Sequence, residues 1–465
     1  MSSDTVTHNT FLHGRQGVIL GKTALPIIFV MGASGLLTVV DAIFLGVYVG
    51  PGALGAVTLM FPVYMVIAAL STLVASGMSS LLARQIGAGR FAEARAVFAS
   101  AHVLALVISG VLILLFLAFG RGLTLLAANG SEALAGMGHV YLGISVMSSP
   151  VLFLLSVNAD ALRSEGRAGL MAGMSLFVSL ANIGLNYLLI ARLGLGVAGS
   201  AWGTALAQAL ALGLLVLFRL RGRTELRPAL PAGRSLIAGW RPILALGAPQ
   251  SLSFLGLALV SATVVATLQM VAGKGYADTV SAYGIITRIM TFVFLPLLGL
   301  SQALQSIVGN NYGAGAFRRS DDSLRIGIAA ALVYCLAAEV LLIALARPIG
   351  LLFVADGATA QEVARIMPVV AALYVVSGPV LVIAAYFQAI GDAARAAILS
   401  LSKPYLFTLP LIALLAATFG ERGIWFATPV ADILLFGATM LVLARSARRQ
   451  GYGWGLFTAS KETAQ

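Results

Sequence analysis

The amino-acid sequence predicts an all-α integral membrane protein with twelve transmembrane helices in two pseudo-repeated six-helix lobes and both termini in the cytoplasm. Of its 465 residues, 60% are hydrophobic and only 10% are charged, whereas an ordinary soluble domain carries about 25% charged residues. The formal charge of +12 therefore indicates membrane topology rather than a nucleic-acid partner. The single cysteine excludes a disulfide framework and a cysteine metal site.

The second observation is that apolar runs near the roughly 20 residues needed to cross hydrocarbon occur twelve times. The polar first 23 residues, followed by a run too long for a signal peptide, argue against a cleaved leader. The expected spans are 24–48, 53–80, 97–119, 139–160, 170–191, 197–218, 243–272, 280–306, 327–346, 366–389, 400–419 and 423–444.

The third observation is the alternation of basic residues between the spans. If the termini and every second loop lie on one side, that side carries 22 of the 29 Lys and Arg residues, with Lys403 counted among them. The opposite side carries six, and Arg288 lies within a span. By the positive-inside rule the richer side is cytoplasmic.

An internal repeat divides the twelve spans into six and six. The sequence Gly-Ala-Gly-x-Phe at 87–91 recurs at 313–317, and the Gly-x-x-Gly-x-x-x-x-Thr-x-x-Ala pattern of 196–207 recurs at 420–431. Halves of six spans share one orientation, an arrangement that favours alternating access. The expected segments are a cytoplasmic N-terminal tail (1–23), an N-lobe (24–218), a cytoplasmic linker (219–242), a C-lobe (243–444) and a cytoplasmic C-terminal tail (445–465).

One carboxylate, Asp41, lies about two thirds of the way along the first span. No basic residue occurs between Lys22 and Arg84, so no local partner neutralises it. An acid at a helix centre costs roughly 2.5–3.5 kcal/mol to insert and usually marks an ion or proton pathway. Low dielectric favours its protonated form, so Asp41 is able to load and release a proton. The alternative is an interfacial acid near a helix end.

Several motifs together resemble the multidrug and toxic compound extrusion (MATE) transporters over residues 26–445. They include Asp41-Ala-Ile-Phe-Leu-Gly46, Leu82-Ala-Arg-Gln-Ile-Gly87, Asn182-Ile-Gly-Leu-Asn186 and Gln302-Ala-Leu-Gln305. The acid in the first span is more similar to the prokaryotic DinF-like branch than to the NorM-like branch, which carries carboxylates in its seventh and tenth helices.

The resemblance implies an N-lobe polar site around Asp41, with Pro26 as a hinge in the first helix. Two positions depart from the family pattern, which commonly has a second acid at Asn186 and a tyrosine at Leu37. Without a second anionic ligand the site favours protons over sodium, although sodium remains possible. The other implied residues of the site are Asn158, Asn182, Asn186 and Thr204.

A mechanism follows as a hypothesis. Deprotonated Asp41 attracts a cationic amphiphile into an apolar cavity, and protonation from outside removes that attraction while the helix bends at Pro26. Pro26 is alternatively a helix-start proline. Without the resemblance, Asn182, Asn186 and Thr204 are equally compatible with interhelical packing.

Three further intramembrane charges are secondary candidates. Glu339 in the ninth span is either a second titrating site that faces the C-lobe cavity or, equally, an acid supported by a partner that the sequence does not identify. Arg288 in the eighth span is expected to form a structural ion pair with Glu339 or with Asp432, whose role stays open. Asp160, beside Arg163, is expected to be a solvated acid at a helix end.

Together these features favour a secondary-active exporter of cationic or amphipathic small molecules in exchange for inward protons. It needs no cofactor or metal, uses an ion gradient as its energy source, contacts membrane lipids and no nucleic acid, and works as a monomer in a prokaryotic inner membrane. A lipid-linked substrate flippase is the nearest alternative, but it would want a cationic cavity and Arg288 is the only base expected inside a span. The sequence shows no clustered acids with histidines or an activated nucleophile, so an enzyme is disfavoured. A channel would not need two repeated lobes.

Overall fold

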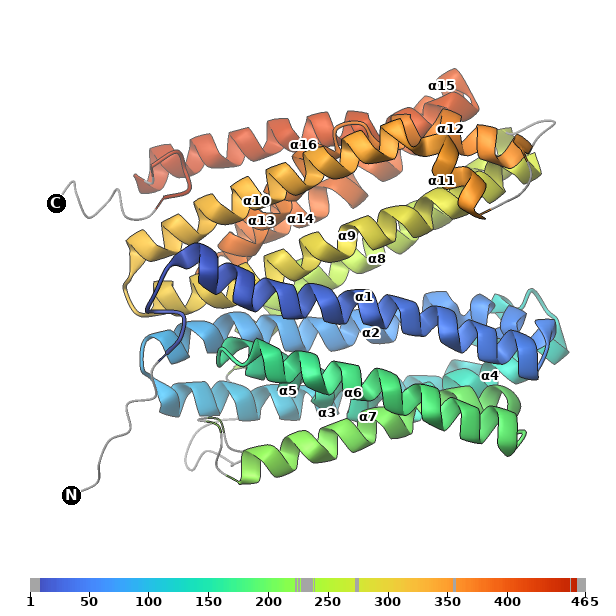
Figure 1. Ribbon diagram of the computed structural model, residues 1–465, viewed down its shortest axis with the longest axis horizontal. Coiled ribbons are helices and arrows are strands. Elements are labelled where there is room, and N and C mark those ends of the chain that lie inside the picture. Colours follow the sequence, from blue (N-terminus) through green and yellow to red (C-terminus); the bar gives the residue numbers. More distant parts are fainter. Residues whose placement is uncertain are drawn as a thin grey trace. The chain divides into compact units, whose positions relative to one another are not determined.

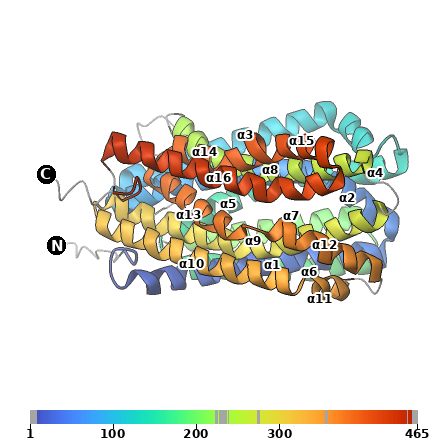
Figure 2. The same ribbon diagram turned by 90° about the horizontal axis from the view of Figure 1, so that it is seen from above.

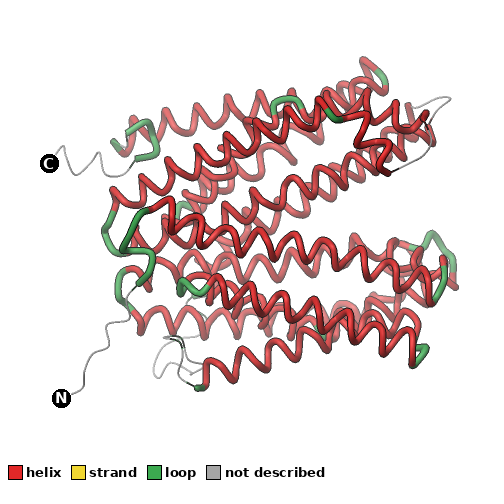
Figure 3. The backbone as a smooth tube through the Cα atoms, viewed as in Figure 1, coloured by secondary structure: helices red, strands yellow, loops and turns green. Residues whose placement is uncertain are grey.

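The computed structural model describes residues 9–221, 224, 226, 237, 239–271, 276–353, 357–451 and 453–457. Within these residues the chain forms helices and no strand (Figure 3). Helices are the expected solution for long apolar runs, because a helix satisfies its own backbone hydrogen bonds where no water is present. The predicted all-α membrane fold is confirmed.

By length and composition, the described residues contain up to twelve segments able to cross a membrane. Ten helices are long and apolar enough to cross a bilayer, and two further spans are each a pair of helices bent at a short break. In the first half the elements are α1 (Gln16–Tyr48), α2 (Pro51–Gly87), α3 (Phe91–Ala127), α4 (Glu132–Met147), α5 (Ser149–Ser164), α6 (Ala168–Asn186), the π-helix η1 (Tyr187–Arg192) and α7 (Gly196–Leu220). In the second half they are α8 (Trp240–Val271), α9 (Tyr276–Gly313), α10 (Phe317–Ala344), α11 (Ala346–Phe353), α12 (Gly357–Ala371), α13 (Tyr374–Ile390), α14 (Ala393–Leu401), the π-helix η2 (Ser402–Thr408), α15 (Leu409–Phe419) and α16 (Glu421–Gln450).

The chain divides into two compact units. The first contains residues 25–251 with a short N-terminal piece, and the second contains residues 252–465 together with residues 15–24. The boundary falls inside α8, and the second unit resumes nine residues beyond the start expected for the C-lobe. Residues 1–8, most of 222–238 and residues 458–465, which belong to the predicted tails and linker, lie outside the described residues.

In the first unit α2 is the central helix. It packs against α3, α4 and α5, while α6 packs against α7 (Figures 1 and 2). The core between these helices is formed by buried side chains such as Met60, Met78, Phe98 and Phe153. A Cβ at Gly77 would overlap the backbone of Ile243 at the start of α8, so the absence of a side chain there permits close helix packing.

In the second unit α10 packs against α9 and α13, and α15 packs against α16. Its core includes Leu268, Ile286, Met367 and Trp425. The single cysteine, Cys335 of α10, is buried. A Cβ at Gly378 of α13 would overlap its sulfur, so α10 and α13 approach each other closely at this point.

The internal repeat is visible in the backbone. Gly89, after α2, and Gly315, after α9, both have left-handed φ values of about +70° and +73°, which glycine adopts without steric cost. The hydrogen bonds at these turns correspond, because Gly89 N donates to the carbonyl three residues earlier and Gly315 N does the same. The Gly-Ala-Gly motifs are therefore helix-ending turns.

The irregular helices repeat as well. The fourth span breaks between α4 and α5 with a bend of 48°, and the tenth breaks between α12 and α13 with a bend of 47°. The fifth span contains η1 and the eleventh contains η2. Because π-turns and broken helices commonly occur at functional positions in membrane proteins, we expect a functional site near these elements.

Candidate functional site

A chain of polar side chains joins three helices inside the first unit. Asn186 Nδ2 donates a hydrogen bond to Asp41 Oδ1 at 2.6 Å and to Asn182 Oδ1 at 3.2 Å. Asn182 Nδ2 in turn donates to Thr204 Oγ1 at 2.9 Å. The structure thus brings together four of the residues that the sequence singled out, Asp41 of α1, Asn182 and Asn186 of α6, and Thr204 of α7.

Local sequence explains this placement. Asn182 and Asn186 are four residues apart and so lie on one face of α6, directly before η1. On α7, a Cβ at Gly203 would overlap the side-chain oxygen of Asn186, so a glycine beside Thr204 makes room for the amide. Both asparagines are fully buried, whereas Asp41 is partly exposed. The arrangement leaves an intramembrane carboxyl held by an amide and still accessible.

Two tyrosines near Asp41 were not anticipated. Tyr64 of α2 and Tyr141 of α4 lie within electrostatic range of the Asp41 carboxyl and of each other. The sequence has Leu37 where the resembling proteins commonly carry a tyrosine, and these two phenols come from other helices. Their spacing along the chain gave no signal, because only the packing of α2 and α4 brings them close to α1.

The structure does not bring Asn158 into this cluster. Asn158 Oδ1 accepts from Arg219 Nε at 2.9 Å, and its amide nitrogen lies 3.0 Å from His102 Nε2. His102 Nδ1 lies 2.8 Å from the Phe98 carbonyl, an arrangement in which a neutral His102 donates through Nδ1 and accepts from Asn158. Asn158 therefore belongs to a second polar network of the first unit.

Arg219 is the centre of that second network. Its guanidinium is fully buried, pairs with Glu165 Oε2 at 3.2 Å, donates to the Leu226 carbonyl at 3.0 Å and lies 4.8 Å above the ring centroid of Phe98. Arg219 is the first residue of the predicted cytoplasmic linker, where a solvated charge is expected. A buried arginine that satisfies a carboxylate, an amide and a carbonyl ties the end of α7 to α5 and α3, and losing one partner would leave an uncompensated buried charge.

Arg288 does not form the ion pair expected of it. Asp432 of α16 instead pairs with Lys403 of η2, whose Nζ lies 2.6 Å from Asp432 Oδ1. Ser377 of α13 joins the pair, because its hydroxyl donates to Asp432 at 2.9 Å and accepts from Lys403 at 2.9 Å. Arg288 is exposed, and no hydrogen bond or ion pair joins it to another residue that the structure describes.

This pair also corrects the placement of Lys403. The residue was counted with a cytoplasmic loop, but η2 lies within the eleventh span, which runs from Ala393 to Phe419. Lys403 thus lies within a helical segment that is long and apolar enough to cross a membrane, as Arg288 does. Two features of the sequence could have predicted this pair. Lys403 lies within an otherwise apolar run, and Asp432 lies in the next span along the chain.

Glu339 binds backbone groups at the break of the tenth span. Its two carboxylate oxygens accept from Leu373 N at 3.0 Å and from Val375 N at 2.9 Å. Leu373 has φ +66°, a left-handed conformation that costs a non-glycine residue roughly 1–2 kcal/mol. Glu339 therefore satisfies the donors that the break releases and stabilises the start of α13. The pairing with Arg288 that the sequence suggested for Glu339 is not present.

The surroundings of Pro26 and Asp160 in the structure correct two further expectations. Pro26 lies inside α1, ten residues after the helix begins, so the helix-start interpretation is wrong and the hinge role stays a prediction. Asp160 pairs with the buried Arg163 at 3.0 Å, so it is an ion-paired acid rather than a solvated one.

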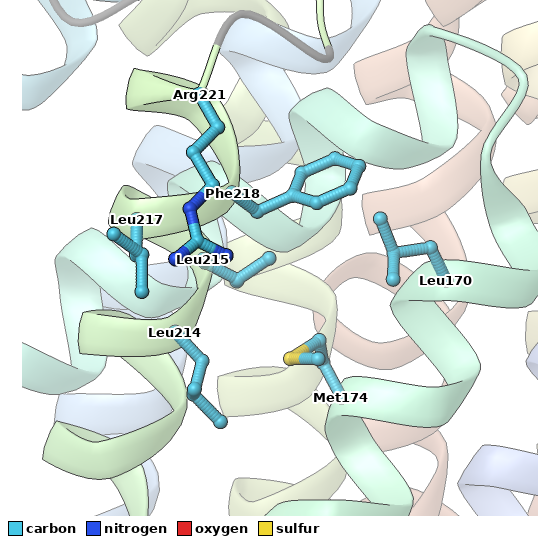
Figure 4. Close-up of a pocket in the computed structure, with 7 residues that line it drawn as sticks. All are labelled: Leu170, Met174, Leu214, Leu215, Leu217, Phe218 and Arg221. Carbon is cyan, nitrogen blue, oxygen red and sulfur yellow. The ribbon is translucent and has the colours of Figure 1, made fainter.

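An apolar groove lies between α6 and α7 of the first unit (Figure 4). Its volume is about 180 Å³, and none of the residues around Asp41 lines it. Arg221 is the one charged residue at its wall, and its side chain extends along α7 beside the leucines in Figure 4. Among the described residues no group of three or more His, Cys, Asp or Glu side chains is placed to hold a metal ion.

The fold and these buried polar clusters define a multi-pass helical membrane protein made of two repeated halves. A family model described as MatE matches residues 26–188 and 251–414, well over half of the chain. The chain belongs to the MatE family, and it is a membrane transporter.

Similar proteins share nearly the whole chain. An FAD transporter from Shewanella oneidensis is 27% identical over 90% of this chain and 92% of its own length. The multidrug export protein MepA of Staphylococcus aureus is 23% identical, with 90% and 92% covered. A crystal structure of a MATE protein in a bent conformation has a TM-score of 0.87 at 22% identity, covering 97% of this chain and 98% of that one. An outward-facing multidrug resistance MATE transporter gives 0.86 at 22% identity, covering 95% and 99%.

Proposed function

We propose that the chain is a secondary-active exporter that exchanges inward protons for cationic amphipathic compounds across a prokaryotic inner membrane, with Asp41 as the coupling acid. The observation that carries the proposal is the carboxyl of Asp41, which is partly exposed within a membrane span and bound by the buried amide of Asn186. Membership of a transporter family and relatives named multidrug export proteins support it.

In this mechanism the charge of Asp41 sets the affinity for the substrate. A deprotonated carboxylate attracts a cation, and protonation from the outside removes the attraction. A ligand shifts a conformational equilibrium only if it binds the two states unequally, and one charge in a low-dielectric site supplies such a difference. Pro26, inside α1, is the proposed hinge, because it removes one backbone hydrogen bond of the helix.

The single carboxylate supports protons rather than sodium as the coupling ion. Asn186 Nδ2 donates to Asp41, so the atom facing the carboxylate is a donor and not a second anionic ligand. Sodium is a hard cation that prefers several oxygen ligands. Sodium coupling and the flipping of a lipid-linked substrate remain the alternatives that the experiment below separates.

A second substrate class follows from one relative. The protein from Shewanella oneidensis is named an FAD transporter, and FAD carries phosphates rather than a cationic amine. Lys403, an ammonium group inside a span, is the feature of this chain that is compatible with such a substrate. Export of a flavin nucleotide is therefore the second candidate function.

The test is accumulation of a fluorescent cationic dye in everted membrane vesicles under an imposed proton gradient, and then under a sodium gradient. We expect the proton gradient to drive accumulation by the wild type and Asp41→Asn to abolish it, because an amide cannot cycle between charged and neutral forms. The matched control is Asp322→Asn, which removes an exposed acid that pairs with Arg325 at the surface.

Three outcomes would contradict the proposal. Accumulation driven by sodium alone would exclude proton coupling, and transport by Asp41→Asn at equal expression would exclude Asp41 as the coupling acid. Accumulation of a fluorescent lipid analogue but not of the dye would favour a flippase.

A further inference from the structure

Each unit contains a cluster of polar side chains, and the two clusters lie on corresponding spans of the repeat. In the first unit Asn186 ends α6 directly before η1, and Asn182, which accepts from Asn186, donates to Thr204 of α7. In the second unit Lys403 lies in η2 and its partner Asp432 lies on α16. The repeat aligns α7 with α16, so each cluster joins the fifth and sixth spans of its half next to a π-helix.

The cluster around Lys403 consists of Lys403, Asp432 and Ser377, and it presents the opposite charge to that of Asp41. The Lys403 side chain is 28% exposed, whereas Asp432 is 2% exposed. Lys403 is therefore the partly exposed member of the pair, and the Asp432 carboxylate is its buried counter-ion. In the first unit, by contrast, the accessible group is the carboxyl of Asp41.

The bonding leaves capacity for a ligand. An ammonium group has three donors, and among the described residues Lys403 Nζ uses two of them, on Asp432 Oδ1 and Ser377 Oγ. Ser377 and Lys403 both bind the same oxygen, Oδ1 of Asp432. An incoming anion can bind the third donor directly, or it can replace Asp432 as the partner of Lys403.

A charged side chain inside a span is energetically unfavourable, and the residues that carry such charges usually have a function. A pair retained only for packing could be replaced by apolar residues at little cost or with a gain in stability. Residues close to the cluster also weaken the helices that carry it, because Pro379, Pro404 and Pro429 lie within three residues of Ser377, Lys403 and Asp432. A proline inside a helix removes a backbone hydrogen bond and permits a bend.

We propose that Lys403 and Ser377 form a subsite in the C-terminal half that binds the phosphate group of an amphipathic substrate, with Asp432 as the counter-ion of Lys403 in the empty site. A lysine is a compact point charge that suits phosphate oxygens. The inference rests on the proposed export function and extends its substrates from cations to phosphate-bearing compounds.

The experiment compares two flavins that differ in one phosphate. Binding of FMN and of riboflavin to the purified full-length protein in phosphatidylcholine nanodiscs is followed by flavin fluorescence, with no ion gradient. We expect the wild type to bind FMN about tenfold more tightly than riboflavin, the effect of one charge-assisted hydrogen bond. Lys403→Met should remove the preference and leave riboflavin binding unchanged, whereas Asp432→Asn should strengthen FMN binding.

Two controls keep the result interpretable. Lys403→Met leaves Asp432 buried without its counter-ion, so the double variant Lys403→Met/Asp432→Asn, which contains no unpaired charge, is measured beside it. Arg288→Met removes an exposed cation of the same half and should keep the FMN preference. Nanodiscs with phosphatidylglycerol replace the zwitterionic phosphate headgroup of phosphatidylcholine by an anionic one, and loss of the preference there would show that an anionic lipid phosphate competes for the subsite.

The proposal is overturned if wild type binds FMN no more tightly than riboflavin, which includes the case in which neither flavin binds. It is also overturned if the double variant keeps the preference. Because binding is measured without a gradient, a failure here is distinct from a failure of proton coupling at Asp41.

Discussion

At the scale of single residues, Asn186 shows how this chain accommodates a departure from the family pattern. The resembling proteins commonly carry an acid at this position, and here an amide donates to Asp41 at 2.6 Å. Gly203 leaves the space that the amide occupies. With an amide instead of an acid at position 186, a hydrogen bond to Asp41 replaces repulsion between two carboxylates. Restoring the acid therefore tests whether the second carboxylate selects the coupling ion.

Asn186→Asp should change the coupling ion of the site from protons to sodium. Two carboxyl groups at hydrogen-bonding distance would supply two anionic oxygen ligands for a cation and would repel each other when it is absent. We expect dye accumulation in everted vesicles to become dependent on a sodium gradient, with at least a threefold stimulation that the wild type does not show.

The control for this experiment is Asn186→Leu. Leucine has a similar size, removes the donor to Asp41 and adds no charge, so it should lower proton-driven accumulation without any response to sodium. A sodium response in the leucine variant would show that the second carboxylate is not its cause.

At the scale of the element, the broken tenth span shows how an intramembrane acid stabilises an irregular backbone. The break between α12 and α13 releases backbone donors, and Glu339 of α10 accepts from two of them. Inside a membrane an unsatisfied donor costs several kcal/mol. These bonds give the Glu339 carboxylate a positioning role, and its role as a second titrating site stays a prediction.

Glu339→Ala should therefore destabilise the second unit by about 2 kcal/mol or more, the scale of hydrogen bonds to a charged group. The buried Cys335 of α10 is the only cysteine in the sequence, so thermal unfolding can be followed with a thiol-reactive dye. We expect dye labelling to begin several degrees lower in the variant than in the wild type.

Asp322→Ala is the matched control, because Asp322 is on the same helix and its pair with Arg325 is exposed. Exposed pairs contribute about 0–1 kcal/mol, so its labelling curve should stay close to that of the wild type. Equal shifts for both variants would mean that the bonds of Glu339 to the break contribute little.

At the scale of the whole molecule, the two halves share a plan in which irregularities recur at matching spans. The left-handed turns at Gly89 and Gly315 end corresponding helices, and η1 and η2 occupy corresponding spans. If each half has six spans, an even number, both termini lie on the same side of the membrane. The topology of the chain then depends on one choice, the side on which the termini lie.

The basic residues predict that both termini are cytoplasmic, even with Lys403 removed from the loop count, because 21 of the remaining residues stay on that side. In a bacterial host, a green fluorescent protein at the C-terminus should fluoresce and alkaline phosphatase at the same position should be inactive. Alkaline phosphatase inserted at Asn129, between α3 and α4, should be active. Reversed activities at the two positions would contradict the predicted orientation.

Much of the fold and part of the site follow from the sequence because they depend on local properties. Hydropathy gave the twelve spans, since crossing a bilayer requires a minimum apolar length. The spacing of Asn182 and Asn186 placed them on one face of a helix, and the resemblance joined them to Asp41 and Thr204. The repeat located Gly89 and Gly315, because glycine adopts the left-handed conformation of these turns without steric cost.

Only the tertiary structure decided the partners of the ionisable groups. Lys403 rather than Arg288 pairs with Asp432, Glu339 binds the backbone of the broken span, and Asn158 belongs with Arg219 rather than with Asp41. The physical reason is that a buried charge takes whichever partner the packing of distant helices brings within about 3 Å. That distance cannot be derived from composition, periodicity or spacing along the chain.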